Sequence, residues 1–203
     1  MNLDVYMVGV GGQGVLTIGD ILVLAAAQAG IPANFYPTKG MAQRGGFVKA
    51  QLRLGRENVG PQISEGSADL VIATERSEAL RAVRFVRAGG DFLLYGHVWQ
   101  PTAVMLGKAS YPSLDEVASQ IRLAKAVMHY LDPEDVPAHQ GAKVADNIYV
   151  LGAALSSSKL GGMFDPVAVG RIVATRWRRG VEANQIAFEA GLKAGSRTRE
   201  AIG

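Results

Sequence analysis

With 203 residues, 48% of them hydrophobic, the chain can bury one sizeable core and is expected to form a single domain. It contains no cysteine, so it can ligate neither an iron–sulfur cluster nor a cysteine-based zinc ion, and it forms no disulfide. Nucleic-acid binding is not expected, because the net charge is only +3, the basic residues are scattered and 7% of the residues are aromatic. No apolar run approaches the ~20 residues of a membrane span, and no signal-type segment opens the sequence, so a cytoplasmic location is expected.

A glycine-rich turn follows the first apolar run. Residues 5–8 predict a strand and residues 15–29 a helix, because apolar residues recur there at helical spacing. This order is typical of units that bind phosphates or dinucleotides, whose helix N-terminus stabilises an anion. The spacing alone is a weak signal, because a tight turn without a ligand gives the same pattern. The turn consists of Gly9, Gly11, Gly12, Gln13 and Gly14.

The interval after the first helix does not suit a nicotinamide cofactor. Such a unit needs an acidic residue about 20 residues after the glycines, to hold the ribose hydroxyls. Residues 21–56 contain no Asp or Glu. They carry five cations instead, and we therefore predict an anionic partner. The cations are Lys39, Arg44, Lys49, Arg53 and Arg56.

A second glycine-rich segment lies within residues 37–46, which we expect to form an irregular loop because they contain a proline and three glycines. Gln43 and Arg44 place hydrogen-bond donors between glycines, where they can approach a carboxylate or a phosphate. The ends of strands one and two lie side by side in a doubly wound sheet, so both loops are expected at one edge. The candidate anion-binding residues are Lys39, Met41, Gln43, Arg44, Gly45 and Gly46.

The remaining first half alternates strands and helices. Residues 47–54 alternate apolar and polar, which predicts a half-exposed strand that is antiparallel or at an edge. We therefore predict an α/β fold, a three-layer Rossmann-like domain with a mixed, mostly parallel sheet. The other predicted elements are strands at 33–36, 69–74 and 91–95, and a helix at 77–86 that Gly89 and Gly90 end.

The second half is predicted to be mostly helical. We assign residues 1–195 to the single domain and residues 196–203 to a flexible tail. A short strand within 98–107 and a linker at 132–141 are the exceptions. The predicted helices are 113–130, 147–155, 166–177 and 182–193.

Other candidate chemistry is weak. His97, His129 and His139 lie far apart and match no metal-binding spacing, so we predict no metal site and no catalytic residue in this chain. The two glycine-rich segments remain as the candidate site.

Read together, these segments resemble the gamma subunit of 2-oxoacid:ferredoxin oxidoreductases. The form of the second motif is most similar to the aryl branch, that is, the indolepyruvate oxidoreductase small subunit and the phenylglyoxylate dehydrogenase gamma subunit. Lys39 stands where that family usually has His, and residues 60–63 depart from its usual Ser-Pro-Leu-Ile. The matching segments are residues 8–17, 40–46, 63–66, 68–69, 111–116, 147, 151–153, 180–184, 187–188 and 191.

The resemblance implies a division of labour. Thiamine diphosphate with Mg²⁺ and the [4Fe-4S] clusters would lie in partner alpha, beta and iron–sulfur subunits. Coenzyme A would be the co-substrate, and the product would be an acyl-CoA. Electrons would pass to ferredoxin, or to NAD through a flavoprotein subunit with FAD in some complexes. This chain would bind no cofactor alone, would be inactive alone, and would offer residues 39–46 to the substrate or to coenzyme A.

Two alternatives remain open at the level of sequence. A free-standing flavin- or nucleotide-binding protein would also need the glycine turn, and the missing acidic residue does not argue against flavin mononucleotide. A purely architectural subunit would use both loops for packing. The sequence determines neither the 2-oxoacid, nor the electron acceptor, nor the subunit stoichiometry.

Overall fold

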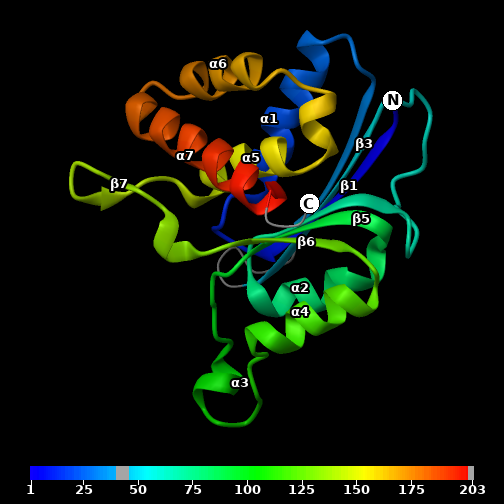
Figure 1. The fold of residues 1–203 in the computed structure, drawn as a ribbon, viewed down its shortest axis with the longest axis vertical. Coiled ribbons are helices and arrows are strands. Elements are labelled where there is room, and N and C mark those ends of the chain that lie inside the picture. The colour runs from blue at the N-terminus through cyan, green and yellow to red at the C-terminus, as the bar shows by residue number, and fades with distance from the viewer. Residues whose placement is uncertain (40–45, 201–203) are drawn as a thin grey trace.

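A six-stranded sheet with helices on both faces forms the body of the chain (Figure 1). The computed structural model describes residues 1–39 and 46–200. Strand β3 runs antiparallel to both of its neighbours, β1 and β2, whereas β1, β4, β5 and β6 are parallel to one another. The predicted mixed, mostly parallel sheet is confirmed. In spatial order the strands are β2 (Ala33–Lys39), β3 (Phe47–Leu54), β1 (Leu3–Val10), β4 (Ala68–Ala73), β5 (Val86–Tyr95) and β6 (Val127–Leu131).

Strand β1 lies inside the sheet, and all eight of its residues are buried. Because side chains alternate along a strand, its odd-numbered residues enter one core and its even-numbered residues the other. Val5 and Met7 belong to the larger core, and Tyr6 and Val8 to the smaller one. A strand buried on both faces explains why its sequence is almost continuously apolar.

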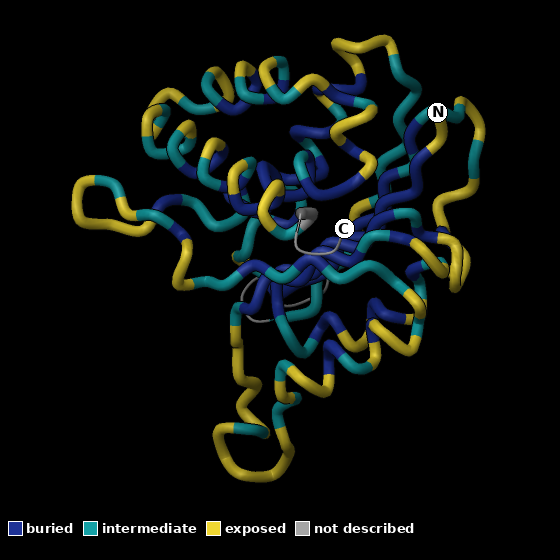
Figure 2. The backbone as a smooth tube through the Cα atoms, viewed as in Figure 1, coloured by how far each residue is buried: buried dark blue, intermediate teal, exposed yellow. Residues whose placement is uncertain are grey.

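The helices form two layers, one on each face (Figures 1 and 2). The larger layer consists of α1 (Val15–Gln28), α5 (Asp146–Ser157), α6 (Pro166–Arg176) and α7 (Val181–Glu200). The smaller layer consists of α2 (Arg76–Ala82) and α4 (Leu114–Leu123). Short elements complete the described chain: helix α3 (Thr102–Met105), 3₁₀ turns at Val83–Phe85, Pro133–Asp135 and Lys159–Gly162, and a hairpin of β7 (Ala138–His139) and β8 (Ala142–Lys143).

Several helix ends follow the signals in the sequence. Gly30, at a φ of 65°, ends α1, and the N–H of Ile31 reaches back to the carbonyl oxygen of Ala26 at 2.9 Å. Ser113 and Glu116 form a capping box at the start of α4. These local motifs need no tertiary partner, which is why sequence alone predicts them.

Helices α5 and α7 pack closely through glycines. A methyl group at Gly191 would overlap the carbonyl oxygen of Tyr149, and one at Gly152 would overlap the carbonyl oxygen of Phe188. Because these atoms belong to the backbone, they cannot move aside without moving a helix. The two glycines therefore set the spacing between α5 and α7.

The loop predicted at residues 37–46 was placed too early. Strand β2 continues to Lys39, and Pro37 pairs with Ala50 of β3. Strand β2 lies at the edge of the sheet, where a residue without an N–H group is tolerated. The loop prediction for residues 40–45 lies outside the described residues.

The predicted helix at 113–130 was too long. Helix α4 ends at Leu123, and β6 begins four residues later. Lys125 makes the reversal with a φ of 57°, a conformation that usually falls to glycine. No Gly or Pro marks this boundary in the sequence.

Three further predictions differ from the structure. The segment 98–107 contains helix α3 and no strand. Gly89 and Gly90 lie within β5, where a φ of 71° at Gly89 accompanies a register shift between β4 and β5. Helix α7 continues to Glu200 through residues expected in a flexible tail. The domain boundary at residue 195 stays a prediction.

Candidate functional site

The glycine turn connects β1 to α1 at the carboxyl edge of the parallel strands. Gly12 and Gly14 have φ values of 102° and 71°, which favour glycine. The N–H of Gln13 donates to the carbonyl oxygen of Val10 at 3.1 Å and closes the turn. Gly14 caps α1 without any side-chain hydrogen bond. The first backbone N–H groups of α1 are therefore not capped by a side chain. The predicted role of the turn in anion binding stays a prediction.

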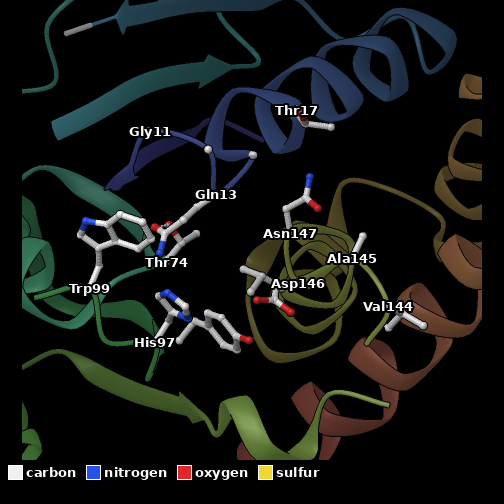
Figure 3. A pocket seen from close by; sticks show the side chains of 14 residues that line it. Gly11, Gln13, Thr17, Thr74, His97, Trp99, Val144, Ala145, Asp146 and Asn147 are labelled. Carbon is white, nitrogen blue, oxygen red and sulfur yellow. Dashed lines mark hydrogen bonds between the residues drawn. The ribbon is translucent and has the colours of Figure 1, made fainter. Parts of the chain in front are cut away.

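Gln13 braces this turn against the neighbouring strand (Figure 3). Its Oε1 atom accepts hydrogen bonds from the backbone N–H of Val10 at 2.9 Å and from the hydroxyl of Thr74 at 2.8 Å. Thr74 follows β4 directly and is buried. The side chain of Gln13 thus joins the ends of β1 and β4.

Replacing Gln13 with Leu should destabilise the chain. The substitution removes the side-chain acceptor of the Val10 N–H and leaves the Thr74 hydroxyl only its longer bond, to the carbonyl oxygen of Val8 at 3.3 Å. We therefore expect a loss of ~1–2 kcal/mol in the free energy of unfolding. The control is Gln120→Leu, at an exposed position of α4, which should change stability by less than ~0.5 kcal/mol. Chemical denaturation of both variants measures the difference, and equal stabilities would show that Gln13 is not a brace.

The positions in the turn require glycine for different reasons. A side chain at Gly9 would overlap the hydroxyl of Thr74, and one at Gly14 would overlap the side chain of Asn147. A methyl group at Gly12 would meet no atom within 4 Å, so only its backbone conformation requires glycine. Gly9 and Gly14 are therefore packing residues, whereas Gly12 leaves open space beside the turn.

That open space is a cleft of about 720 Å³, a volume within the usual range for small-molecule sites (Figure 3). The glycine turn forms one wall, and the N-terminus of α5 forms the adjoining one, since Gly14 packs against Asn147. Helix α5 begins at Asp146, and its N-cap residue, Ala145, supplies no side-chain hydrogen bond. Two helix N-termini without side-chain caps therefore meet at this cleft. Both favour negative charge, and the carboxylate of Asp146 already supplies one such charge in the first turn of α5.

A third wall comes from the segment that follows β5. Tyr95 ends the strand, and His97 and Trp99 follow at alternate positions, so all three lie along the same cleft. The rings of Tyr95 and His97 are nearly parallel, with centroids 6.2 Å apart. Burial, and then the neighbouring carboxylate of Asp146, raise the pKa of Tyr95 well above its usual value, so its hydroxyl stays protonated. This aromatic wall gives the cleft an apolar side opposite its helix N-termini.

Sequence reasoning missed this aromatic wall. His97 was noticed only as one of three separate histidines, whereas in the structure it lines the cleft. Asp146 was not considered, and Asn147 entered only through the family resemblance. The alternation of Tyr95, His97 and Trp99 directly after a buried strand was the available signal.

The two glycine-rich segments meet, although not for the predicted reason. Strand β3 lies between β1 and β2, so the ends of strands one and two are not neighbours. Gly46 instead precedes β3, which pairs with β1, and its carbonyl oxygen accepts the N–H of Gly11 at 2.8 Å. Lys39 ends β2. Met41, Gln43, Arg44 and Gly45 lie outside the described residues, and their anion-binding role stays a prediction.

Not all five cations of residues 21–56 need an anion from outside the chain, contrary to the prediction. Arg53 donates to both carboxylate oxygens of Asp4, at 3.0 and 2.9 Å, and Arg56 reaches the same carboxylate at 3.0 Å. Asp4 is only 3% exposed. Asp4 lies outside residues 21–56, the interval that contains no acidic residue. The pairing of β1 with β3 nevertheless brings Asp4 opposite Arg53. Two of the five cations are therefore already paired.

The other histidines have local partners. His129 is buried, and its Nε2 atom lies 3.0 Å from Asp91 Oδ1 across β5 and β6. His139 lies 3.6 Å from Glu182. Within residues 1–39 and 46–200, no three His, Asp or Glu side chains cluster as metal ligands would, and no helix is long and apolar enough to cross a bilayer.

The chain is similar to known proteins of one family. The pyruvate ferredoxin/flavodoxin oxidoreductase family matches residues 4–194. An indolepyruvate oxidoreductase subunit IorB from Archaeoglobus fulgidus is 38% identical over 152 residues, which are 75% of each chain.

Two solved structures share the fold at low sequence identity. Pyruvate oxidoreductase subunit PORC from Thermotoga maritima superposes with a TM-score of 0.69 at 19% identity, over 95% of this chain and 96% of that one. A 2-oxoglutarate:ferredoxin oxidoreductase chain from Magnetococcus marinus superposes with a TM-score of 0.66 at 16% identity, over 97% of this chain and 31% of that one. Since the family match spans nearly the whole sequence, the chain belongs to the pyruvate ferredoxin/flavodoxin oxidoreductase family, as its two glycine-rich motifs predicted.

Proposed function

We propose that this chain is a subunit of a 2-oxoacid oxidoreductase that depends on thiamine diphosphate and iron–sulfur clusters and acts on an aryl 2-oxoacid of the indolepyruvate or phenylglyoxylate type. The observation that carries the proposal is the 38% identity, over three quarters of the chain, to a protein named as an indolepyruvate oxidoreductase subunit. The form of the second glycine-rich motif supports the same branch. The chain would work in the cytoplasm.

The reaction would convert the 2-oxoacid to an acyl-CoA. The bond between the carboxyl and carbonyl carbons breaks and CO₂ leaves. The acyl group joins the sulfur of coenzyme A, whose thiol loses its proton, and the two electrons that are released pass to ferredoxin or, through a flavoprotein subunit, to NAD. Thiamine diphosphate supplies the carbanion chemistry. Alpha, beta and iron–sulfur partner subunits would hold that cofactor, its Mg²⁺ and the clusters.

The residues of this chain do not fit those groups. An iron–sulfur cluster needs cysteine thiolates, and the sequence has no cysteine. A Mg²⁺ site needs several oxygen ligands, and the described residues bring no three acidic or histidine side chains together. This chain would therefore carry out no redox step, and we expect it to be inactive alone.

This chain would contribute the surface at the carboxyl edge of its parallel strands. The cleft combines two helix N-termini with an aromatic wall, and the second glycine-rich segment leaves the same edge through Gly46. Among the residues that the structure describes, none that lines the cleft is a Lys or an Arg. Arg44, on the adjoining segment, would supply the cationic contact to a 2-oxoacid carboxylate or to a phosphate of coenzyme A.

Replacing Arg44 with Met tests this role in the assembled enzyme. Loss of a charged hydrogen bond to a substrate costs ~1.5–3 kcal/mol, so kcat/KM should fall about 10- to 150-fold for the substrate that Arg44 contacts. The two values are measured separately, for the 2-oxoacid and for coenzyme A. Arg178→Met is the control, because Arg178 is exposed between α6 and α7.

Unchanged kcat/KM values for both substrates, in a fully assembled Arg44→Met complex, would remove this segment from the active-site surface. A complex that fails to assemble would instead place Arg44 against a carboxylate of a partner subunit, a contact that suits an arginine at an interface.

A second function is favoured by the cleft itself. Its volume and its aromatic wall also suit a flavin or another nucleotide, with the phosphates at the glycine turn. A visible absorption spectrum of the purified chain separates the two functions. Our proposal predicts a colourless protein, and a flavin band that is lost in Gly12→Leu would favour the alternative.

A further inference from the structure

A projecting arm, residues 97–112, leaves the body of the chain between β5 and α4 (Figure 1). It carries the short helix α3 near its tip and extends beyond the smaller helix layer. Most of it is exposed, as Figure 2 shows. The arm takes no part in the sheet or in either described core.

Both ends of the arm are fixed to one buried carboxylate. Glu75 has no exposed surface and caps α2. It accepts hydrogen bonds from the backbone N–H of Trp99, at 3.2 Å, and from the hydroxyl of Tyr111. The N–H of Arg76 also donates to the carbonyl oxygen of His97 at 3.0 Å. The base of the arm is therefore held in place while its tip projects.

The arm has an unusually apolar surface for an exposed segment. Nine large hydrophobic side chains are exposed among the described residues, and four of them lie between residues 98 and 106. Met105 is 72% exposed and Leu106 is 63% exposed. Lys108 is the only Lys, Arg, Asp or Glu in the sixteen residues of the arm. An exposed apolar surface with so few charged residues marks an interaction site.

The base of the arm is continuous with the cleft, because Trp99 belongs to both. A protein that covered the arm would therefore also close one side of the cleft. In the Magnetococcus marinus chain this fold makes up 31% of a longer polypeptide, so the fold occurs with further domains attached. These two observations favour a catalytic partner over a second copy of this chain.

We propose that the arm docks into an apolar depression on the catalytic subunit, the one that holds thiamine diphosphate, and so brings the cleft to the active site. The inference rests on the proposed function. Met105 and Leu106 are the central contacts, and Trp99 connects them to the cleft. Met and aromatic residues are enriched at protein interfaces, and burying the exposed apolar area of Leu106 adds binding energy.

The test measures the dissociation constant between this chain, at full length, and the co-expressed catalytic subunit. We expect Met105→Lys and Leu106→Lys each to raise it at least tenfold, which corresponds to about 1.4 kcal/mol. The control is Leu123→Lys, since Leu123 is 74% exposed but lies at the end of α4. Because Met105 and Leu123 are almost equally exposed, the variants should fold equally well, and circular dichroism checks this.

Three results would overturn the inference. If wild type binds the catalytic subunit and both arm variants bind equally tightly, the arm is not the docking element, although the proposed function survives. If the arm variants abolish self-association of this chain but still bind the catalytic subunit as tightly as wild type, the arm joins two copies of the chain. If wild type does not bind the catalytic subunit at all, the proposed function itself fails.

Discussion

Replacing Asp4 with Asn should lower the free energy of unfolding by ~3–5 kcal/mol, the largest stability effect we expect in this chain. The carboxylate is almost fully buried and accepts hydrogen bonds from both Arg53 and Arg56. Removing its charge leaves Arg53, whose side chain is 16% exposed, without a counter-charge between β1 and β3. The side chain of Arg56 is one-third exposed, so water compensates for part of the ion pair that it loses with Asp4.

Glu65→Gln is the matched control, because it also removes a carboxylate that faces an arginine. The side chains of Glu65 and Arg84 are both about two-thirds exposed and 3.4 Å apart, so this variant should change stability by less than ~0.5 kcal/mol. Urea denaturation compares the two variants. Similar losses in both would mean that burial of the Asp4 cluster contributes nothing.

Gly191→Ala should be the second most damaging substitution, with a loss of ~2–3 kcal/mol. The new methyl group meets the carbonyl oxygen of Tyr149, so α5 and α7 must move apart. An alanine normally stabilises a helix by ~0.5–1 kcal/mol relative to glycine, and the overlap has to exceed that gain. For a chain of this size the melting temperature should fall by about 4–12 °C.

Gly170→Ala provides the same substitution in the middle of α6. Its methyl group would contact the ring of Phe188 at 3.4 Å without overlapping any backbone atom. The helical gain should therefore dominate, and this variant should be as stable as wild type or slightly more stable. A fall in melting temperature for Gly170→Ala equal to that for Gly191→Ala would rule out backbone overlap as the cause.

Local signals in the sequence predicted much of the fold. The buried strands β1 and β4, the glycine turn, the capping residue Ser113 and the glycine after α1 follow from apolar patterns and from backbone preferences. Each of these signals depends on residues that are close in sequence. The same is true of Pro166, at the first turn of α6.

The errors share a different cause, since they depend on where a segment lies in the finished sheet. Pro37 was assigned to a loop because the sequence did not show that β2 is an edge strand. The break at Lys125 went unnoticed because a lysine adopts a conformation that glycine usually takes. In both cases tertiary context overrides the local preference.

The site was predictable only in part. The glycine turn was found from its motif, but Asp4 was overlooked as the partner of Arg53 because 49 residues separate them in the sequence. The aromatic wall comes from residues 95–99, and the opposite wall from the start of α5. Only the parallel sheet brings these distant segments to one edge.

This chain would complete a 2-oxoacid oxidoreductase without carrying its redox groups. The direct measurement is viologen reduction by the co-expressed partner subunits with coenzyme A, with and without this chain, on indolepyruvate, phenylglyoxylate and pyruvate. We predict activity only when the chain is present, and a higher kcat/KM for an aryl 2-oxoacid than for pyruvate. Partner subunits that are equally active without the chain would contradict the account.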